Sequence, residues 1–149
     1  MADPSGLAAR HVLLVDDEAD FLAELKYFLG RRGWVVSTSD TPAGALAQLE
    51  AHPDIAVMVT DVRIADLDGF ALAAEVQRDY TGHREVAVMV VTGHGELAGR
   101  TNTATTDNLP ILPKPLAMPN FIRLLEAALA RALSARAAGQ APPVQANRV

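Results

Sequence analysis

The 149-residue sequence contains no cysteine. Disulfide bonds, thiolate catalysis and cysteine-bound zinc or iron–sulfur sites are therefore excluded. Aromatic side chains are also scarce, at 5% of the chain, and no apolar run approaches the ~20 residues of a membrane-spanning helix. The first ten residues lack the basic and apolar stretches of a secretory signal. We therefore expect a cytoplasmic protein with no membrane partner.

Basic residues are outnumbered in this chain. It has 13 lysines and arginines against 18 aspartates and glutamates, which gives a net charge of −5. This balance argues against a nucleic-acid partner, because proteins that bind nucleic acid usually carry a basic surface. The length predicts one domain with a substantial buried core. The main question is therefore where the acidic residues lie.

Short apolar runs alternate along the chain with helical patterns. The predicted strands cover residues 11–15, 34–39, 55–60, 86–91 and 109–112, and the predicted helices cover residues 21–29, 42–49, 70–80 and 119–137. Strands that are apolar throughout are typical of a parallel sheet buried between two layers of helices. The sequence thus predicts an α/β fold with a doubly wound five-stranded parallel sheet.

The two ends of the chain lack this periodicity. We predict a flexible N-terminus over residues 1–9, a folded domain over residues 10–132, and a helix extension with a disordered tail over residues 133–149. We expect the alanine-rich extension to fray into solvent, because a helix with a polar surface gains little stability without packing.

Polar side chains follow directly on four of the apolar strands. Asp16 and Asp17 come after the first strand, Asp61 after the third, Thr92 after the fourth and Lys114 after the fifth. Because the carboxyl ends of parallel strands lie along one edge of a sheet, these side chains should converge there. Three neighbouring carboxylates need a compensating charge. Mg²⁺, which prefers oxygen ligands and phosphate groups, would provide it.

Such a group of side chains suits the formation of an aspartyl phosphate, in which a carboxylate is the nucleophile. Thr92 could hydrogen-bond a phosphoryl oxygen, and Lys114 could pair with negative charge. Phosphoryl transfer depends mainly on positioning and charge neutralisation, and these residue types supply both.

The order of these motifs resembles the receiver domain of response regulators in bacterial two-component signalling, of the stand-alone type. The motifs are Val15-Asp16-Asp17-Glu18, Asp61 followed by Asp68-Gly69, Val91-Thr92-Gly93 and Lys114-Pro115. Each motif is weak alone, but together they run in order at strand ends, and the resemblance covers roughly Ala9 to Arg131. It implies the flavodoxin-like receiver fold.

The resemblance also implies a metal site and a nucleophile. Asp61 would be the phospho-acceptor. The implied cofactor is Mg²⁺, bound by Asp17 directly, by Asp16 largely through water, by Asp61 itself, and by the backbone carbonyl of Arg63.

Further residues take implied roles in transfer and in its control. Thr92 would bind the phosphoryl group and move toward it as part of a switch, and Lys114 would pair with the acyl phosphate. The bond from Lys114 to Pro115 is expected to be cis. Arg63 and His94 occupy the positions whose side chains tune, in this family, how fast water removes the phosphoryl group.

The implied partners are proteins. A sensor histidine kinase or a histidine phosphotransfer protein would donate the phosphoryl group, and an unknown downstream protein would receive the signal by contact. The protein would be a monomer or a weak dimer. It would not be an enzyme in the ordinary sense, because it would catalyse only its own phosphorylation and dephosphorylation.

Three features depart from the family pattern. Ala65 stands where many receivers have proline. Ile111 occupies the switch position at which Tyr or Phe is common, so the usual exchange between Thr92 and an aromatic ring is in doubt. Residues 96–107 are rich in threonine and contain only one sizeable apolar residue, Leu97, which predicts an atypical, weakly helical fourth helix.

Several alternatives stay open. The chain could be the excised receiver of a hybrid histidine kinase or larger regulator. It could be a Mg²⁺-dependent aspartyl-phosphate phosphatase, although Arg63 stands where many such enzymes have a second acid. A degenerate receiver that only binds proteins is opposed by the intact acidic motifs. A flavodoxin-like cofactor binder is disfavoured because Asp16, Asp17 and Glu18 would repel phosphate.

Other polar residues are interpreted as structural. Asp66 and Asp68 fit a turn or a helix N-cap ahead of the third helix. Glu18 fits the first turn of the first helix rather than a metal site. His11 fits a surface or strand-edge position, and Trp34 is expected to contribute to packing.

Overall fold

The computed structural model of the chain describes residues 10–93 and 109–139. In chain order the elements are β1 (His11–Val15), α1 (Ala19–Gly30), β2 (Val35–Ser39), α2 (Pro42–Ala51), β3 (Ile55–Asp61), β4 (Arg63–Ile64), β5 (Leu67–Asp68), α3 (Gly69–Asp79), the 3₁₀ helix η2 (Gly82–Arg84), β6 (Ala87–Thr92), β7 (Ile111–Pro113) and α5 (Met118–Gly139).

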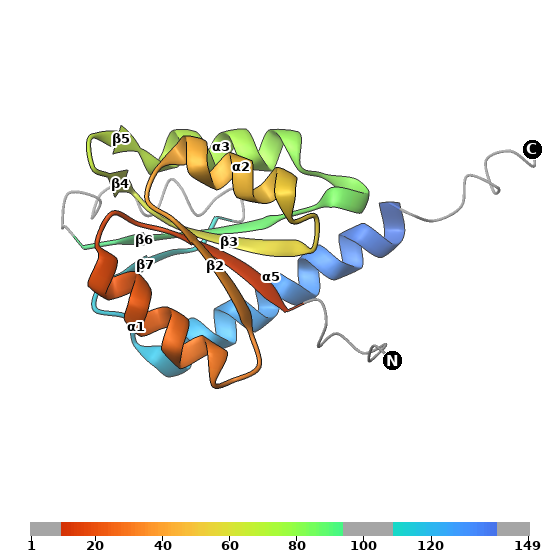
Figure 1. The fold of residues 1–149 in the computed structure, drawn as a ribbon. Helices are drawn as coiled ribbons and strands as arrows, with labels where there is room; N and C mark the ends of the chain where they lie inside the picture. The colour runs from red at the N-terminus through yellow and green to blue at the C-terminus, as the bar shows by residue number, and fades with distance from the viewer. Residues whose placement is uncertain (1–9, 94–108, 140–149) are drawn as a thin grey trace, which may run out of the picture.

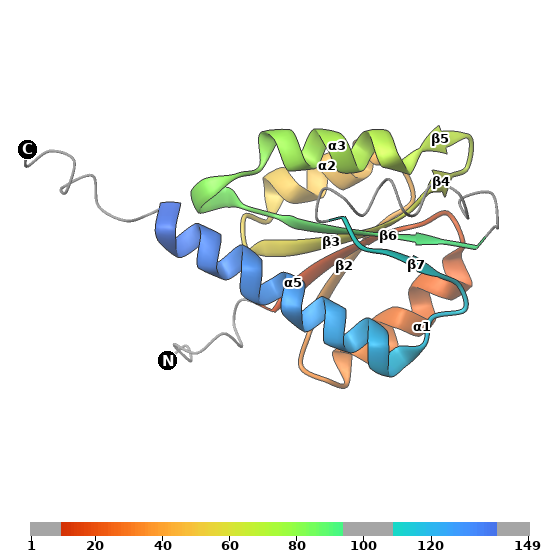
Figure 2. The same ribbon diagram turned by 180° about the vertical axis from the view of Figure 1, so that it is seen from behind.

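Five strands form one parallel sheet in the order β2-β1-β3-β6-β7, which confirms the predicted architecture. Helices α2 and α3 cover one face of the sheet, and α1 and α5 cover the other (Figures 1 and 2). Strand β2, which follows β1 in the chain, pairs on one side of β1, and β3 pairs on the other side of β1. The carboxyl ends of β1 and β3 therefore lie side by side at the point where ligands bind in open α/β sheets.

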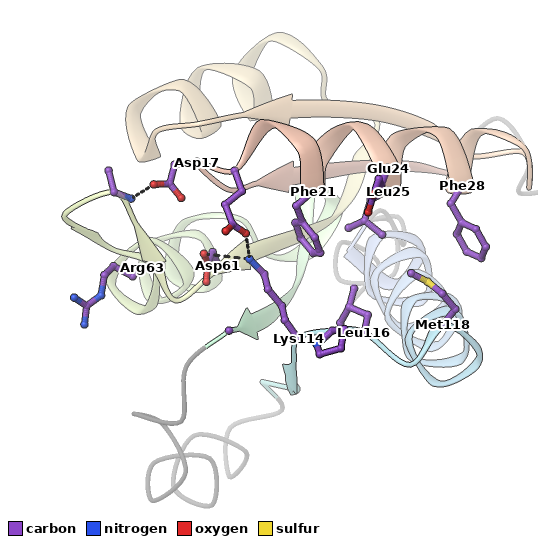
Figure 3. Close-up of a pocket in the computed structure, with 14 residues that line it drawn as sticks. Asp17, Phe21, Glu24, Leu25, Phe28, Asp61, Arg63, Lys114, Leu116 and Met118 are labelled. Atoms are coloured by element: carbon purple, nitrogen blue, oxygen red, sulfur yellow. Dashed lines mark hydrogen bonds and ion pairs between the residues drawn. The ribbon is translucent and has the colours of Figure 1, made fainter.

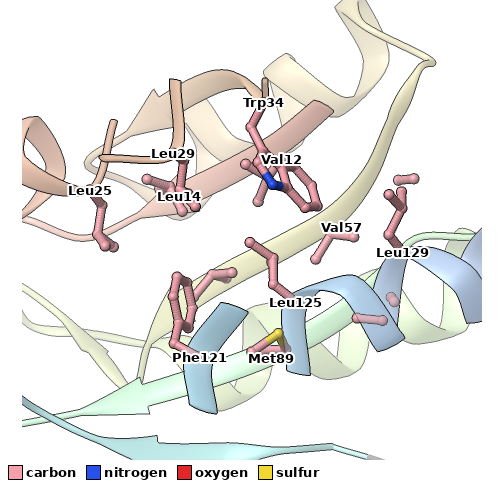
Figure 4. Close-up of a cluster of buried hydrophobic side chains, with 14 of the residues drawn as sticks. Val12, Leu14, Leu25, Leu29, Trp34, Val57, Met89, Phe121, Leu125 and Leu129 are labelled. Carbon is pink, nitrogen blue, oxygen red and sulfur yellow. The ribbon is translucent and has the colours of Figure 1, made fainter. Parts of the chain in front are cut away.

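Alternate residues of the buried strands feed two separate cores, because successive side chains of a strand point to opposite faces. Between the sheet and α1 and α5, Val12, Leu14 and Met89 pack against Phe121 and Leu125 (Figure 4). The core on the other face includes Leu13, Met58, Ile64, Leu72 and Val76, among others. Both cores hold the central strands rigidly, which fixes the ends of β1 and β3.

Side chains cap the starts of α2 and α3, and the cap of α3 is one that the sequence predicts. Thr41 is the N-cap of α2, and its hydroxyl accepts a hydrogen bond from the Gly44 N–H at 2.9 Å, with Pro42 in the first turn. Asp68 is the N-cap of α3 and accepts hydrogen bonds from the N–H groups of Phe70 and Ala71. These caps satisfy N–H groups that have no partner within the helix.

Several strand boundaries differ from the predicted ones by one or two residues, and two of these differences have a clear cause. The second strand begins at Val35 rather than Trp34, because the Trp34 N–H bonds to the carbonyl of Leu29 at the end of α1. The last strand begins at Ile111 rather than Leu109. Pro110 lacks an N–H donor and takes part only through its carbonyl, which accepts from Val90. Trp34 itself is buried in the core, as expected.

The expected exposure of His11 was wrong. This residue is 4% exposed and lies between two partners at the amino edge of the sheet. Its Nδ1 is 2.8 Å from Asp54 Oδ2, and its Nε2 is 2.7 Å from the Ser37 hydroxyl. A buried imidazole is tolerated there because both ring nitrogens have hydrogen-bond partners.

The expected fraying of the last helix is also not seen within the described residues. Helix α5 continues to Gly139, and Ala132 in its second half is fully buried. The guanidinium of Arg136 donates to the backbone carbonyls of Glu85, Pro53 and Ile55 at 2.7–2.9 Å. These contacts join the extension to the turns that precede β3 and β6.

Some predictions fall outside the described residues. They concern the flexible N-terminus over residues 1–9, His94, the weakly helical segment over residues 96–107, and the tail from residue 140 onward. Among the helices that the structure describes, none combines the length and the hydrophobicity needed to cross a membrane.

Candidate functional site

The three predicted acidic residues meet at the carboxyl edge of the sheet. Asp16 and Asp17 follow β1 directly, and Asp61 is the last residue of β3. Asp16 and Asp61 are buried, with 2% and 7% of their surface exposed, whereas Asp17 is exposed. One carboxylate oxygen from each residue lies within 4.8 Å of the other two. The structure therefore brings together the carboxylates that the strand ends predicted.

Backbone N–H groups fix the orientation of the two buried carboxylates. The Glu18 N–H donates to Asp16 Oδ1 at 2.9 Å, and the Val62 N–H donates to Asp61 Oδ1 at 2.7 Å. Each acid thus has one oxygen held by the backbone immediately after it. This arrangement limits the rotation of both side chains.

A short hairpin orients the exposed acid. Strands β4 and β5 form an antiparallel pair directly after Asp61, and Ala65 in its turn has a φ of 58°. This left-handed conformation is unfavourable for a residue with a Cβ. It directs the Ala65 N–H to Asp17 Oδ2 at 3.1 Å (Figure 3). Asp66 lies in the same turn, as predicted.

The start of α3 lies very close to the end of β3. A Cβ placed on Gly69 would lie 1.8 Å from the carbonyl oxygen of Asp61. The Gly69 N–H also donates to the Val62 carbonyl at 2.8 Å. Only glycine fits between α3 and the end of β3, so the Asp68-Gly69 motif both caps the helix and allows it to pack beside Asp61.

Lys114 supplies the positive charge of the site. Its Nζ lies 2.8 Å from Asp16 Oδ2, 2.9 Å from Glu18 Oε1 and 3.5 Å from Asp61 Oδ2. The ammonium group also lies 4.2 Å from the centroid of the Phe21 ring, a favourable cation–π contact. The peptide bond from Lys114 to Pro115 is cis, as the resemblance implies.

The charges of the site shift two pKa values in the described structure. Burial, together with the negative charge of Asp16, raises the pKa of the Asp61 carboxyl, although Lys114 and backbone N–H groups act against this shift. Burial acts to lower the pKa of Lys114, but its hydrogen bonds to Asp16 and Glu18 outweigh that effect, so the pKa is raised. Lys114 therefore stays charged, whereas the ionised form of the Asp61 carboxyl is disfavoured without a further cation.

The donor set fits Mg²⁺. Three carboxylates with an oxygen of each within 4.8 Å of the others offer only oxygen ligands, which is the chemistry that this hard cation requires. The buried pair of Asp16 and Asp61 carries repulsion that a divalent cation would relieve. The residues present therefore match the cofactor that the resemblance implies.

The remaining predicted residues lie around this centre. Thr92 ends β6, beside the end of β3, and its carbonyl accepts a hydrogen bond from the Lys114 N–H at 2.7 Å. Arg63 is exposed, and its guanidinium points away from Asp61 (Figure 3). Ile111 is half-buried at the start of β7 and packs against the core on the α2 and α3 side.

A groove opens from the acidic centre toward α1. It has a volume of about 850 Å³ and includes Asp17, Asp61 and Lys114 at one end. Toward the other end it is lined by apolar side chains from α1 and from the connection between β7 and α5. These side chains are Phe21, Leu25, Phe28, Leu116 and Met118 (Figure 3).

Sequence analysis missed two residues of the site. Glu18 was interpreted only as a first-turn acid of α1, yet its carboxylate contacts Lys114. Phe21 was predicted only as the first residue of the helix over residues 21–29, yet its ring lies against the same ammonium group. Both contacts join residues almost a hundred positions apart, and no local spacing signals them.

Comparisons with known proteins agree with this geometry. The family model described as "Response regulator receiver domain" matches residues 12–126. The transcriptional regulatory protein KdpE of Mycobacterium tuberculosis is 29% identical over 120 residues, which cover 80% of this chain and 51% of KdpE. The chain spans between about a quarter and a half of the length of such regulators from Escherichia coli and M. tuberculosis.

Solved structures show the same fold. A response regulator receiver domain protein from Clostridium thermocellum is 26% identical, with a TM-score of 0.71 over 81% of this chain and 94% of that one. The NtrC4 receiver domain, solved as a beryllofluoride-activated dimer, is 25% identical, with a TM-score of 0.72 over 83% of this chain and 98% of that one.

Proposed function

The chain belongs to the response regulator receiver domain family, and we propose that it accepts a phosphoryl group on Asp61 in a reaction that requires Mg²⁺. The observation that carries this proposal is the cluster of three carboxylates beside one lysine at the carboxyl edge of the sheet. Carboxylates of this kind act as nucleophiles toward phosphorus when their charge is balanced.

The transfer itself exchanges one bond to phosphorus for another. A carboxylate oxygen of Asp61 attacks the phosphorus atom, and the bond from phosphorus to the donor's nitrogen or oxygen breaks. The electron pair of that bond leaves with the donor. An acyl phosphate then departs as a carboxylate, and a phosphohistidine whose second ring nitrogen is protonated departs as neutral imidazole. In dephosphorylation, water attacks the phosphorus, the Asp61 carboxylate is restored, and a proton is released with phosphate.

Other residues of the site bind and orient the transferred group. The Val62 N–H holds one oxygen of Asp61 in place. The Lys114 ammonium, 3.5 Å from Asp61 Oδ2, pairs with negative charge on the acyl phosphate, and the Thr92 hydroxyl donates to a phosphoryl oxygen. Bound Mg²⁺, held by Asp16, Asp17, Asp61 and the Arg63 carbonyl, would supply charge neutralisation for the phosphoryl oxygens.

The donor is, in this proposal, a sensor histidine kinase or a histidine phosphotransfer protein, and the signal passes on by contact with a downstream protein. Arg63 and His94 tune the loss of the phosphoryl group. The groove supports a protein donor, because its apolar side chains adjoin Asp61 and offer a surface for docking. The only reactions that the chain catalyses are then its own phosphorylation and dephosphorylation.

The test is incubation with Mg²⁺ and acetyl phosphate, followed by measurement of the intact mass. We expect the mass to increase by one phosphoryl group in the native protein. The increase should disappear in Asp61→Asn and after chelation of Mg²⁺. Asp66→Asn is the matched control, because Asp66 is an exposed acid in the turn that follows Asp61, and this variant should be labelled like the native protein.

Two other results would contradict the proposal. Hydrolysis of many donor molecules per chain, without a phosphorylated species, would indicate a phosphatase. The absence of any reaction or Mg²⁺ dependence would indicate a module that only binds proteins.

A further inference from the structure

The ammonium group of Lys114 is shared unequally among its acidic neighbours. It lies 2.8 Å from Asp16 and 2.9 Å from Glu18 but 3.5 Å from Asp61, the proposed acceptor. Asp16 is buried, whereas 63% of the Glu18 side chain is exposed. The lysine side chain is 14% exposed, and Glu18 is the most exposed of its three acidic neighbours.

Glu18 differs from the other acids in its relation to the metal-binding group. That group contains Asp16, Asp17 and Asp61, and Glu18 is not part of it. A cation bound by the three aspartates would not itself engage Glu18, whose carboxylate lies 2.9 Å from the Lys114 ammonium. A phosphoryl group on Asp61 must then share one ammonium with a competing carboxylate.

We propose that Glu18 is a positioning residue that draws the Lys114 ammonium toward solvent and so lowers the affinity of the site for a phosphoryl group at Asp61. The inference rests on the proposed function. Its physical basis is that a hydrogen bond between charged groups is directional, so an ammonium held by Glu18 is not optimally placed for an oxygen on Asp61. Glu18 also adds a negative charge close to the incoming anion.

Glu24 provides a matched control. It lies two turns further along α1 and lines the same groove as Glu18. Among the described residues, no hydrogen bond or ion pair joins Glu24 to Lys114. Glu18→Gln and Glu24→Gln therefore remove the same charge from the same groove, but only the first removes a contact to the lysine.

The experiment measures the affinity for beryllofluoride, a phosphoryl mimic that binds carboxylates, by calorimetry at saturating Mg²⁺. Glu18→Gln should bind beryllofluoride about three- to fivefold more tightly than the native protein, an effect of the size typical of an exposed ion pair. Glu24→Gln should stay close to the native value. The gain should shrink as salt is raised, because salt screens exposed charges. It should also vanish in a Lys114→Gln background, since the effect acts through the lysine.

Two results would contradict the role proposed for Glu18. If Glu18 only supports Lys114 structurally, Glu18→Gln will bind beryllofluoride more weakly. Equal gains in both glutamine variants would show a general charge effect. Either result overturns the role of Glu18 while native labelling by acetyl phosphate still supports the proposed function. If the native protein is not labelled, the proposed function fails and this inference fails with it. Urea unfolding of each variant confirms that the fold is intact.

Discussion

The two edges of the sheet use polar groups in opposite ways. At the carboxyl edge, Asp16 and Asp61 are buried as like charges, and Lys114 is the cation between them. At the amino edge, the buried polar groups have complementary partners. His11 lies between Asp54 and Ser37, and the Arg136 guanidinium donates to three backbone carbonyls.

This difference separates the parts of the fold that provide stability from those that provide chemistry. Buried like charges destabilise a folded protein unless a ligand compensates them. In this protein they lie where we propose that a cation and a phosphoryl group bind. Buried groups with matched partners stabilise the fold and attract no ligand. One sheet accommodates both because the two edges lie at opposite ends of its strands.

The largest effect is expected from a variant that disrupts the carboxyl edge. In Gly69→Ala, the new methyl group would overlap the Asp61 carbonyl, since a Cβ at this position would lie 1.8 Å from an oxygen that belongs to the backbone and cannot easily move away. We expect a loss of about 3 kcal/mol or more in the free energy of unfolding, together with a loss of phosphorylation. Urea unfolding and intact mass measure the two effects.

The control for this variant is Gly30→Ala. A Cβ at Gly30, the last residue of α1, would meet no atom within 4 Å. Gly30→Ala should therefore leave stability unchanged or raise it slightly. Similar behaviour of the two variants would show that Gly69 is not required for the approach of α3 to β3.

The next largest effect is expected from a variant that disrupts the amino edge. Arg136→Ala removes hydrogen bonds to the carbonyls of Glu85 and Pro53, which precede β6 and β3, and of Ile55, the first residue of β3. We expect the free energy of unfolding to fall by about 2–4 kcal/mol, because charged donors are lost and carbonyls are left without partners. Arg131→Ala, on an exposed position of the same helix, should change it by less than about 0.5 kcal/mol. Phosphorylation of native-like Arg136→Ala should be retained, and its loss would contradict the separation of the two edges.

The smallest expected effect concerns how the free energy of unfolding depends on pH. Asp61 and Asp54 should contribute to this dependence with opposite signs, as measured by urea unfolding without Mg²⁺. Burial and the charge of Asp16 raise the pKa of Asp61 above 3.8. Its contribution to stability is therefore present at low pH and is lost as the pH rises through the folded-state pKa. Burial also acts to raise the pKa of Asp54, but the hydrogen bond and charge of His11 outweigh it and lower that pKa below 3.8. Its contribution is present above the unfolded-state pKa and is lost as the pH falls.

Two variants separate these contributions. Asp61→Asn should remove the part of the stability that is lost as the pH rises. Asp54→Asn should remove the part that is lost as the pH falls. A change of the same sign in both variants would show that the two edges do not differ electrostatically.

Most of the fold and the acidic centre could be predicted from the sequence. Apolar strands that end abruptly in Asp16, Asp61 or Thr92 indicate both the sheet and the edge at which these residues meet. The signal is strong because a parallel sheet brings every strand end to one edge, whatever the connections between strands. Asp68 could likewise be predicted as a cap, because capping is a local interaction.

The contacts that could not be predicted are long-range and polar. Arg136 binds backbone carbonyls, and every residue carries such an acceptor, so no residue type marks its partners. His11 is buried only because Asp54 and Ser37 come from two other segments. The contact of Glu18 with Lys114 depends on the path of the chain after β7. Each of these depends on the tertiary arrangement rather than on a local pattern.

Helix α5 connects the two edges in a mechanical sense. Its 22 residues form a rod of about 33 Å that begins beside the groove at Met118 and is anchored near its far end by Arg136 (Figure 2). Phe121, Leu125 and Ala132 are fully buried along this rod, so it is held to the sheet over its length as well as by Arg136. A displacement of the segment between Lys114 and Met118 would therefore have to move the helix as one packed body rather than its first turn alone.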